Sequence, residues 1–454
     1  MKNYHKNRFA YGFGTIGRDM VYTLISMYLI FYLTDVIEVS TKTLWWLSMI
    51  ILVCRIFDAL NDPIMGLVVD NTHSKFGKFK PWILFGTLTS GVLTILLFSD
   101  FHLSTFWYIV SFAILFLSWG ITYTTNDIAY WSMLPALSTD QQEREKLGAM
   151  ARIFANIGLF FVVAGIVPIT NYFAKITDSL PTGYFLFAMM VVGIMWLGQA
   201  VTLIFVKQPI LAKTEKQATA LKDLKNVIFK NDQLLVTAIA MLLFMIGYCI
   251  TTAFGLYYFK YAYGDENMYS IFAVVLGVSQ LVAIVSFPKI VAILKRQKLY
   301  LIAIVLVFLG YLLFFFADKN MALISVSGIL LFTGEAFIQM LMLMFLTDTV
   351  EYGQWLLHKR NESITFSLQP FINKMAGAIA SGVVAVTVII SGMKEAETAM
   401  DMSADGLLVL KIAMFGLPLI FIIAGFILYL KKYKLDEVYY NKIVLELKAR
   451  GDLI

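Results

Sequence analysis

Ionisable side chains interrupt several long apolar stretches of this sequence. Asp58 and Asp62 are four residues apart, so both lie on one face of a helix. Two carboxylates on one face repel each other, and the repulsion grows where water is excluded. A small hard cation would remove that repulsion, because such ions prefer oxygen ligands. We therefore predict a cation site at Asp58 and Asp62, completed by Thr124 and Asp127, which lie three residues apart on another stretch.

The same acids allow a second interpretation that needs no bound cation. Arg55 lies on the stretch that carries Asp58 and Asp62, and Lys374 lies on a distant one. These two cations could neutralise the acids in a static charge network. We favour the cation site and keep Arg55 and Lys374 as residues that couple the sites.

A second group of residues combines carboxylates with aromatic rings. Asp127 and Trp131 are four residues apart, and Tyr123 lies one turn earlier. Carboxylates accept hydrogen bonds from sugar hydroxyls, and aromatic rings stack on the pyranose. Further charge-assisted hydrogen bonds are available from Arg18, Asp19 and Arg152. Trp131 taken alone is more typical of packing, so the sugar prediction rests on the group.

The elements that position these residues follow from composition. The chain has 454 residues, of which 59% are hydrophobic and 15% charged, whereas a soluble domain carries about 25% charge. A helix needs about 20 apolar residues to cross a bilayer. Twelve stretches qualify: 9–36, 43–69, 81–99, 105–135, 148–174, 183–206, 233–262, 268–293, 299–317, 321–347, 362–392 and 406–430. The sequence predicts an all-α membrane protein with twelve transmembrane helices, in which Glu335 and Lys411 are helix–helix partners.

The distribution of Lys and Arg predicts the orientation in the membrane. Most of them fall in the loops that share a side with the N-terminus and in the C-terminal tail, so both termini are expected in the cytoplasm and the chain in the cell membrane. Cys54 and Cys249 lie within spans, which excludes a disulfide framework. The first apolar stretch has no small-residue cleavage site and is expected to be a helix rather than a removed signal peptide.

A long polar stretch divides six spans from six, which is the layout of major-facilitator transporters. We expect an N-terminal half at 1–206, a cytoplasmic middle loop at 207–232, a C-terminal half at 233–430 and a cytoplasmic tail at 431–454. The loop after the second span places Asp70 before Lys75, Lys78 and Lys80, a loop pattern of that superfamily. The tail could be a surface-lying helix or a solvated segment.

Seven motifs then carry a family resemblance that covers essentially the whole chain. They are Tyr11–Asp19, Arg55–Gly66, Lys75–Trp82, Asp127–Pro135, Glu143–Lys146, Asn231–Gln233 and Asp348–Gly353. With them the chain resembles the glycoside–pentoside–hexuronide:cation symporters, and in particular the melibiose permeases and lactose carriers.

The resemblance implies roles for individual residues. The positions of Asp58 and Asp62 bind Na⁺, Li⁺ or H⁺, with that of Thr124 close by, and no other cofactor is implied. The remaining implied positions serve the sugar: Asp19, Asp127, Trp131 and Arg152 bind it, Arg18 stands beside them where a Lys is usual, and Lys374 faces the shared site from the other half. Tyr123 and Gln369 complete our candidate substrate contacts.

The chain also departs from the pattern of those families. Gln339 stands where the permeases have a sugar-contacting Trp, and Pro370 stands where they have Thr. Lys359 aligns with a His of the lactose carriers, and the chain stops at Ile454 without the regulatory domain that those carriers commonly have. These departures leave the exact sugar open.

The resulting prediction is a symporter that carries a galactoside, such as melibiose or lactose, with Na⁺ or H⁺. A pentoside or hexuronide symporter, a drug exporter and a non-transporting sensor are the alternatives. An enzyme is not expected, because neither a phosphate-binding G-x-x-x-x-G-K loop nor H-E-x-x-H occurs. The expected partners are a sugar, a cation and the lipid bilayer, with no nucleic acid and no obligate protein partner.

Overall fold

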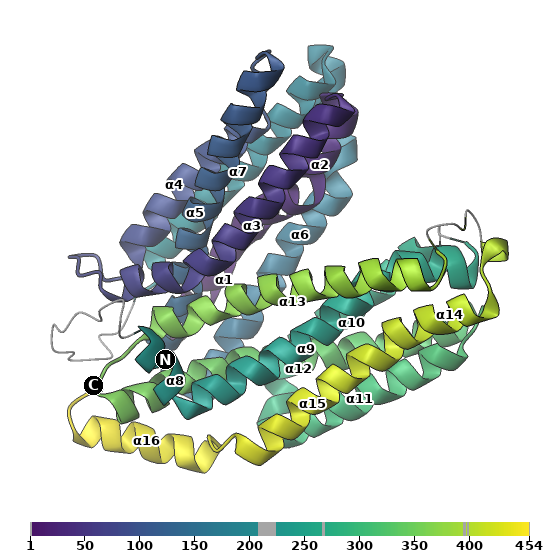
Figure 1. Ribbon diagram of the computed structural model, residues 1–454. Helices are drawn as coiled ribbons and strands as arrows, with labels where there is room; N and C mark the ends of the chain where they lie inside the picture. The colour runs from purple at the N-terminus through teal and green to yellow at the C-terminus, as the bar shows by residue number, and fades with distance from the viewer. Residues whose placement is uncertain (1, 208–223, 266–267, 394–395, 397–398, 454) are drawn as a thin grey trace. The chain divides into compact units, whose positions relative to one another are not determined.

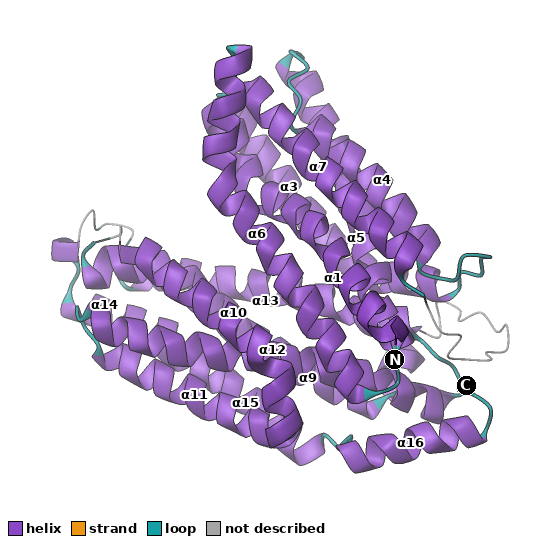
Figure 2. Ribbon diagram, turned by 180° about the vertical axis from the view of Figure 1, so that it is seen from behind, coloured by secondary structure: helices purple, strands orange, loops and turns teal. Residues whose placement is uncertain are grey.

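The regular structure of the chain is helical throughout the described residues. The computed structural model describes residues 2–207, 224–265, 268–393, 396 and 399–453, and Figure 2 shows helices connected by short loops. Twelve helices in this part of the chain are long and apolar enough to cross a membrane, which confirms the predicted fold class. In lipid, a helix satisfies its own backbone hydrogen bonds, so long apolar stretches of this sequence adopt no other form.

The chain divides into two compact units. The first unit comprises Met1–Leu224, Asn361–Ser367 and Arg450–Ile454. Its helices are α1 (Lys2–Thr23), η1 (Leu24–Tyr28), α2 (Leu29–Phe31), η2 (Tyr32–Val36), α3 (Thr41–Asp70), α4 (Lys80–Leu97), α5 (Thr105–Leu137), α6 (Gln141–Thr177) and α7 (Leu180–Phe205). The first four run on continuously as one span, and α1 packs against α6 and α7 (Figure 1).

The second unit comprises Lys225–Arg360 and Leu368–Ala449. Its helices are α8 (Leu224–Lys230), α9 (Asp232–Tyr257), η4 (Tyr258–Tyr263), α10 (Met268–Leu294), α11 (Arg296–Phe316), α12 (Met321–Leu357), α13 (Glu362–Ile390), η5 (Ala399–Asp401), α14 (Ala404–Lys411), η6 (Ile412–Gly416), α15 (Leu417–Lys432) and α16 (Glu437–Ala449). The first residues of α8 and α13 belong to the first unit.

Two helices extend well beyond the apolar stretches that predicted them. The helix α6 begins at Gln141 rather than 148, and α12 continues to Leu357 rather than 347. Both extensions are polar but enclosed by protein. Arg144 donates to the Pro135 carbonyl (3.0 Å), and Arg296 pairs with the buried Asp348 (2.5 Å). Hydropathy marks the membrane-facing part of a helix and misses turns that are buried by such contacts.

The C-terminal tail forms the helix α16, as one of the two predicted alternatives had it. Tyr440, Ile443, Val444 and Leu447 bury one side of this helix, and the Trp355 indole donates to Glu446 (2.7 Å), which joins it to α12. Most of the predicted middle loop at 207–232 lies outside the described residues, which resume at 224.

Glycines bring α1 close to its two neighbours in the first unit. A Cβ on Gly17 would overlap the backbone of Met195 in α7, and one on Gly158 in α6 would overlap the carbonyl of Ile16. Only hydrogen fits at these contacts, so α1 is held at a fixed depth. The glycine-rich motif Tyr11–Asp19 therefore fixes where Arg18 and Asp19 enter the first unit.

Candidate substrate and cation sites

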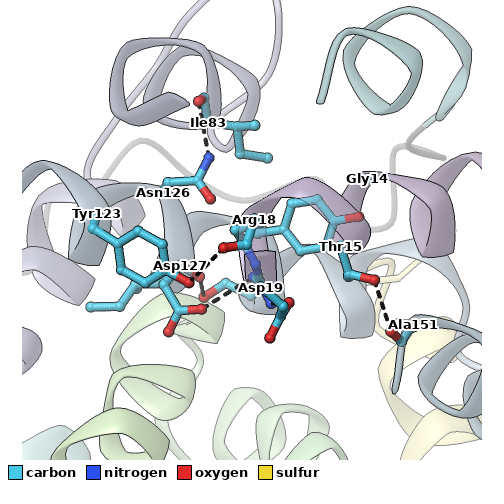
Figure 3. Close-up of polar contacts among 12 residues, drawn as sticks. Gly14, Thr15, Arg18, Asp19, Ile83, Tyr123, Asn126, Asp127 and Ala151 are labelled. Atoms are coloured by element: carbon cyan, nitrogen blue, oxygen red, sulfur yellow. Dashed lines mark hydrogen bonds and ion pairs between the residues drawn. The ribbon is translucent and has the colours of Figure 1, made fainter. Parts of the chain in front are cut away.

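A buried arginine joins two carboxylates from different helices. The Arg18 side chain is only 2% exposed, and its two amino groups lie 3.1 Å from Asp19 Oδ2 and 3.1 Å from Asp127 Oδ1 (Figure 3). The two carboxylates are 26% and 22% exposed. A guanidinium in low-dielectric surroundings orients its carboxylate partners strongly. Arg18 thus fixes α1 against α5 and leaves both carboxylates oxygen surface that can accept further hydrogen bonds.

Aromatic rings cover the two arginines of this group. The Arg18 guanidinium lies 4.7 Å from the centroid of the Tyr130 ring and 5.1 Å from that of Trp131, and the Arg152 guanidinium lies 4.9 Å from Trp131. Trp131 is 6% exposed. Such cation–π contacts stabilise a desolvated cation. In this structure Trp131 packs against the arginines, so stacking on a sugar would require one of them to move off its ring.

Tyr123 belongs to a row of stacked rings on α5. It stacks on Trp119 (5.2 Å between centroids), and Trp119 stacks on Phe116 (6.0 Å). The Tyr123 hydroxyl donates to the Arg18 carbonyl (3.4 Å), and its ring stacks on Tyr22 of α1 at 5.6 Å. The row holds α5 in register beside α1, which keeps Asp127 opposite Arg18.

Polar contacts between neighbouring helices, α5 with α4 and α1 with α6, complete this frame. Asn126 donates to the Ile83 carbonyl (3.2 Å) and to the Thr87 hydroxyl (2.8 Å), both on α4. Thr15 donates to the Ala151 carbonyl on α6 (2.8 Å), as Figure 3 shows. Hydrogen bonds of this kind, from a side chain to the backbone of a neighbouring helix, help to hold helices together in lipid. The hydrophobic effect contributes little to this association, because the lipid tails are as apolar as the helix surfaces.

The two acids of α3 are buried, and one of them, Asp58, lies against a glycine of α5. Asp62 is fully buried and Asp58 nearly so, and a Cβ on Gly120 would lie 2.6 Å from Asp58 Oδ1 and 2.7 Å from Asp58 Oδ2. Gly120, the buried Thr124 and Asp127 are spaced by four and three residues, so they follow one face of α5. The missing side chain at Gly120 makes a cradle for a carboxylate, which fits a cation site built on Asp58.

The predicted ligand set is not gathered into one cluster in this structure. Within the described ranges, no three His, Cys, Asp or Glu side chains lie close enough together to hold a metal ion. Asp127 is engaged with Arg18, about 10 Å along the helix axis from Gly120 at 1.5 Å per residue. The cation ligands Asp58, Asp62, Thr124 and Asp127 therefore stay a prediction.

A family model described as MFS/sugar transport protein matches residues 10–437. The chain belongs to that family. The raffinose carrier protein of Pediococcus pentosaceus is 32% identical over 97% of this chain and 71% of its own length. The lactose permease of Lactobacillus delbrueckii subsp. bulgaricus is 32% identical over 99% of this chain and 73% of its own length. The predicted membership of the glycoside–pentoside–hexuronide:cation symporters is confirmed.

Solved structures share the fold of this transporter, although their sequences are much less similar to it than those of the relatives above. The E. coli fucose:proton symporter FucP is 11% identical, with a TM-score of 0.67 over 94% of this chain and 98% of its own. A bacterial homologue of the iron transporter ferroportin in an outward-facing state is 12% identical, with a TM-score of 0.67 over 95% and 99%. These likenesses confirm the major-facilitator fold.

The other predicted residues of the transporter lie on α3, α13 and α14. Arg55 is exposed on α3, and none of the ion pairs among the described residues involves it. Gln369 is buried and Lys374 half-buried, both on the part of α13 that belongs to the second unit. Lys411 pairs with Asp318 (2.7 Å), which lies in the turn after α11, so it joins α14 to that turn.

The loop after α3 forms a buried charge network inside the first unit. The Asp70 carboxylate accepts from the backbone N–H groups of Ser363 (3.1 Å) and Ile364 (2.9 Å), so it caps the start of α13. Lys78 pairs with Asp70 (2.7 Å) and with Glu362. Burial lowers the pKa of Lys78, but the two carboxylates outweigh burial and raise that pKa overall. The predicted loop pattern thus holds the first turn of α13 through Asp70 and Lys78.

The arginine cluster comprises Arg18, Arg152, Asp19, Asp127 and Trp131. Sequence reasoning missed two aromatic residues beside it. Tyr22 is 44% exposed and stacks on Tyr123, while Tyr130 lies under Arg18 and stacks on Tyr11 at 4.8 Å. Tyr22 lies three residues after Asp19, hence on the same helix face. That spacing was the available signal for Tyr22.

Proposed function

We propose that this transporter carries a neutral galactoside together with Na⁺ or H⁺, using the α3 acids for the cation and the arginine cluster for the sugar. One observation carries the proposal: a single helix, α5, supports both places. Gly120 of α5 receives the Asp58 carboxylate, and Asp127 of the same helix is held by Arg18. A shift of α5 that follows cation binding would therefore reach the carboxylate that binds the sugar.

The cation side of the proposal rests on buried carboxylates. Placing ionised side chains within the bilayer is costly, by about 2.5–3.5 kcal/mol each at the centre. Asp58 and Asp62 carry two such groups on one helix face, and a monovalent cation reduces their charge. Carboxylate and hydroxyl oxygens suit Na⁺, Li⁺ and H⁺ alike. Thr124, buried one turn after Gly120, supplies the hydroxyl.

The sugar side rests on charge balance in the arginine cluster. Arg18 and Arg152 together carry the same formal charge, with opposite sign, as Asp19 and Asp127. A neutral glycoside leaves this balance intact, whereas a uronate adds a negative charge beside two carboxylates. The names of relatives described as lactose permeases and a raffinose carrier support a galactoside for this chain as well.

We further propose a location in the cell membrane with both termini in the cytoplasm. The support is the concentration of Lys and Arg in the segments that share a side with the N-terminus and in the C-terminal tail. On this topology the Asp70–Lys78–Glu362 network faces the cytoplasm. Single-cysteine labelling at Lys75 from each side of the membrane tests the orientation.

The test of the proposed function is uphill uptake into proteoliposomes. Radiolabelled lactose, melibiose and raffinose are offered under an imposed Na⁺ gradient and, separately, an imposed H⁺ gradient. We expect one sugar to accumulate under one gradient and the accumulation to be lost with Asp58→Cys, while sugar binding partly survives. Accumulation of a hexuronide or pentoside instead would replace the galactoside assignment. Accumulation that Asp58→Cys leaves unchanged would refute the cation site.

A further inference from the structure

A carboxyl group to which no role in transport has been assigned above is enclosed in the second unit. Glu335 lies on α12 and is fully buried. Its Oε1 lies 3.4 Å from the Tyr311 hydroxyl of α11, and its Oε2 has no hydrogen-bond partner among the described residues. None of the ion pairs in the described part of the chain involves Glu335. The predicted helix–helix contact is thus present between α11 and α12, but it uses only one of the two oxygens of the Glu335 carboxyl.

The groups that face Glu335 carry no formal charge. They are Tyr248 and Cys249 from α9 and Tyr311 from α11. Around them, Thr251 contacts Tyr311, while Gln280 of α10 and Gln339 of α12 contact Tyr248. An isolated carboxylate in apolar surroundings is far more costly than a neutral carboxylic acid, so such a group takes up a proton. The surroundings of Glu335 therefore favour the neutral acid over the carboxylate.

Hydroxyl groups beside Glu335 can serve both of its protonation states. The Thr251 and Tyr311 hydroxyls are 2.5 Å apart and either can donate, and Thr251 also reaches the Gly247 carbonyl (3.0 Å). If Glu335 is ionised, Tyr311 donates to it and accepts from Thr251. If Glu335 is protonated, it donates to Tyr311, which donates to Thr251, which donates to Gly247. The hydrogen bonds between these hydroxyls can therefore reverse direction by rotation of the hydroxyl hydrogens alone.

Half-buried polar side chains also lie near Glu335. Gln280 donates to the Tyr248 hydroxyl (3.3 Å), and Tyr248, Gln280 and Gln339 are all half-buried. Tyr248 lies three residues before Thr251, on the same face of α9. Tyr248 also interacts electrostatically with Glu335, so half-buried polar groups stand close to the carboxyl.

We propose that Glu335 is a proton-binding site of the second unit, which takes up and releases one proton during the transport cycle. The site is separate from Asp58 and Asp62, and the proposal rests on coupled sugar transport as the function. The ligand is a proton and not a metal ion, because among the described residues only the Tyr311 hydroxyl lies within hydrogen-bond distance of the carboxyl, and these oxygens are too few for a cation shell.

The test compares Glu335→Gln with Glu335→Asp in proteoliposomes. Glutamine imitates the neutral acid permanently, so E335Q should retain exchange of labelled for unlabelled sugar, which needs no net proton movement. It should lose accumulation under whichever gradient, Na⁺ or H⁺, drives the wild type, and it should lose the proton uptake that sugar induces. E335D keeps a titratable group and should retain part of both. Wild-type accumulation by E335Q would overturn the proposal, because Glu335 would then be only a neutral hydrogen-bonding partner.

Two further measurements separate this proposal from the proposed function and from misfolding. Infrared difference spectroscopy of the purified wild type across pH should show a protonated carboxyl that E335Q lacks, whether or not any sugar is transported. If E335Q does not fold, Tyr311→Phe keeps the carboxyl and breaks the row of hydroxyls, so it should shift the pH at half-maximal uptake. An unchanged pH profile would overturn the proposal. Failure of the wild type to move any sugar would instead refute the proposed function.

Discussion

Adding one methyl group to α5 at Gly120 tests whether the close contact between this glycine and the Asp58 carboxylate is needed for cation binding. In Gly120→Ala the new Cβ would lie 2.6 Å and 2.7 Å from the two Asp58 oxygens, so the carboxylate must move by several tenths of an ångström. A free carboxylate can turn aside, whereas a bound cation fixes it, so the strain falls mainly on the bound state. Overpacking of this kind costs about 1–3 kcal/mol. That range corresponds to roughly 5- to 150-fold weaker cation binding.

The assay is a Na⁺ titration of the purified protein by isothermal titration calorimetry, repeated as a pH titration if H⁺ is the coupling ion. Gly193→Ala on α7 is the matched control, because nothing lies within 4 Å of its new Cβ. Both changes raise helix propensity equally, by about 0.5–1 kcal/mol. We expect weaker cation binding only in G120A, with sugar affinity in the absence of the cation preserved. Equal cation affinity in G120A, G193A and wild type would refute the reasoning.

Two further predictions concern buried ion pairs. Arg18→Gln leaves Asp19 and Asp127 without the cation that joins them, which should cost about 3–5 kcal/mol. Thermal unfolding in detergent should occur at lower temperature and sugar binding should be lost, while Arg18→Lys retains part of both; wild-type sugar affinity in R18Q would contradict the assignment. Asp70→Asn removes the charged cap of α13 and should destabilise the protein by about 0.5–2 kcal/mol, and an unchanged unfolding midpoint would argue against that contact.

The fold was predictable because lipid imposes a single rule along the whole sequence. Each apolar stretch long enough to cross the bilayer became a helix, and all twelve spans were foreseen. The starts and ends were less predictable where polar turns are buried by distant partners. Arg8 with Glu143 at the start of α6, and Arg296 with Asp348 near the end of α12, are pairs that no local window contains.

The candidate site was predictable to the extent that it depends on spacing within one helix. The spacing of Asp58 and Asp62, and that of Asp127 and Trp131, places each pair on one face. The contact of Arg18 with Asp127 joins residues more than a hundred positions apart, and the cradle at Gly120 is defined by what the residue lacks. Such features depend on how helices pack against one another, which no short-range pattern in a single sequence encodes.

Thermodynamic linkage between cation and sugar tests the central claim most directly. Sugar affinity is measured by calorimetry with and without the coupling cation, and cation affinity with and without the sugar. If the α3 acids and the arginine cluster act through α5, each ligand must tighten the other by the same factor, and Asp62→Asn must abolish the effect while sugar binding itself remains. Affinities that are independent of each other in the wild type, or a linkage that survives in D62N, would contradict the account.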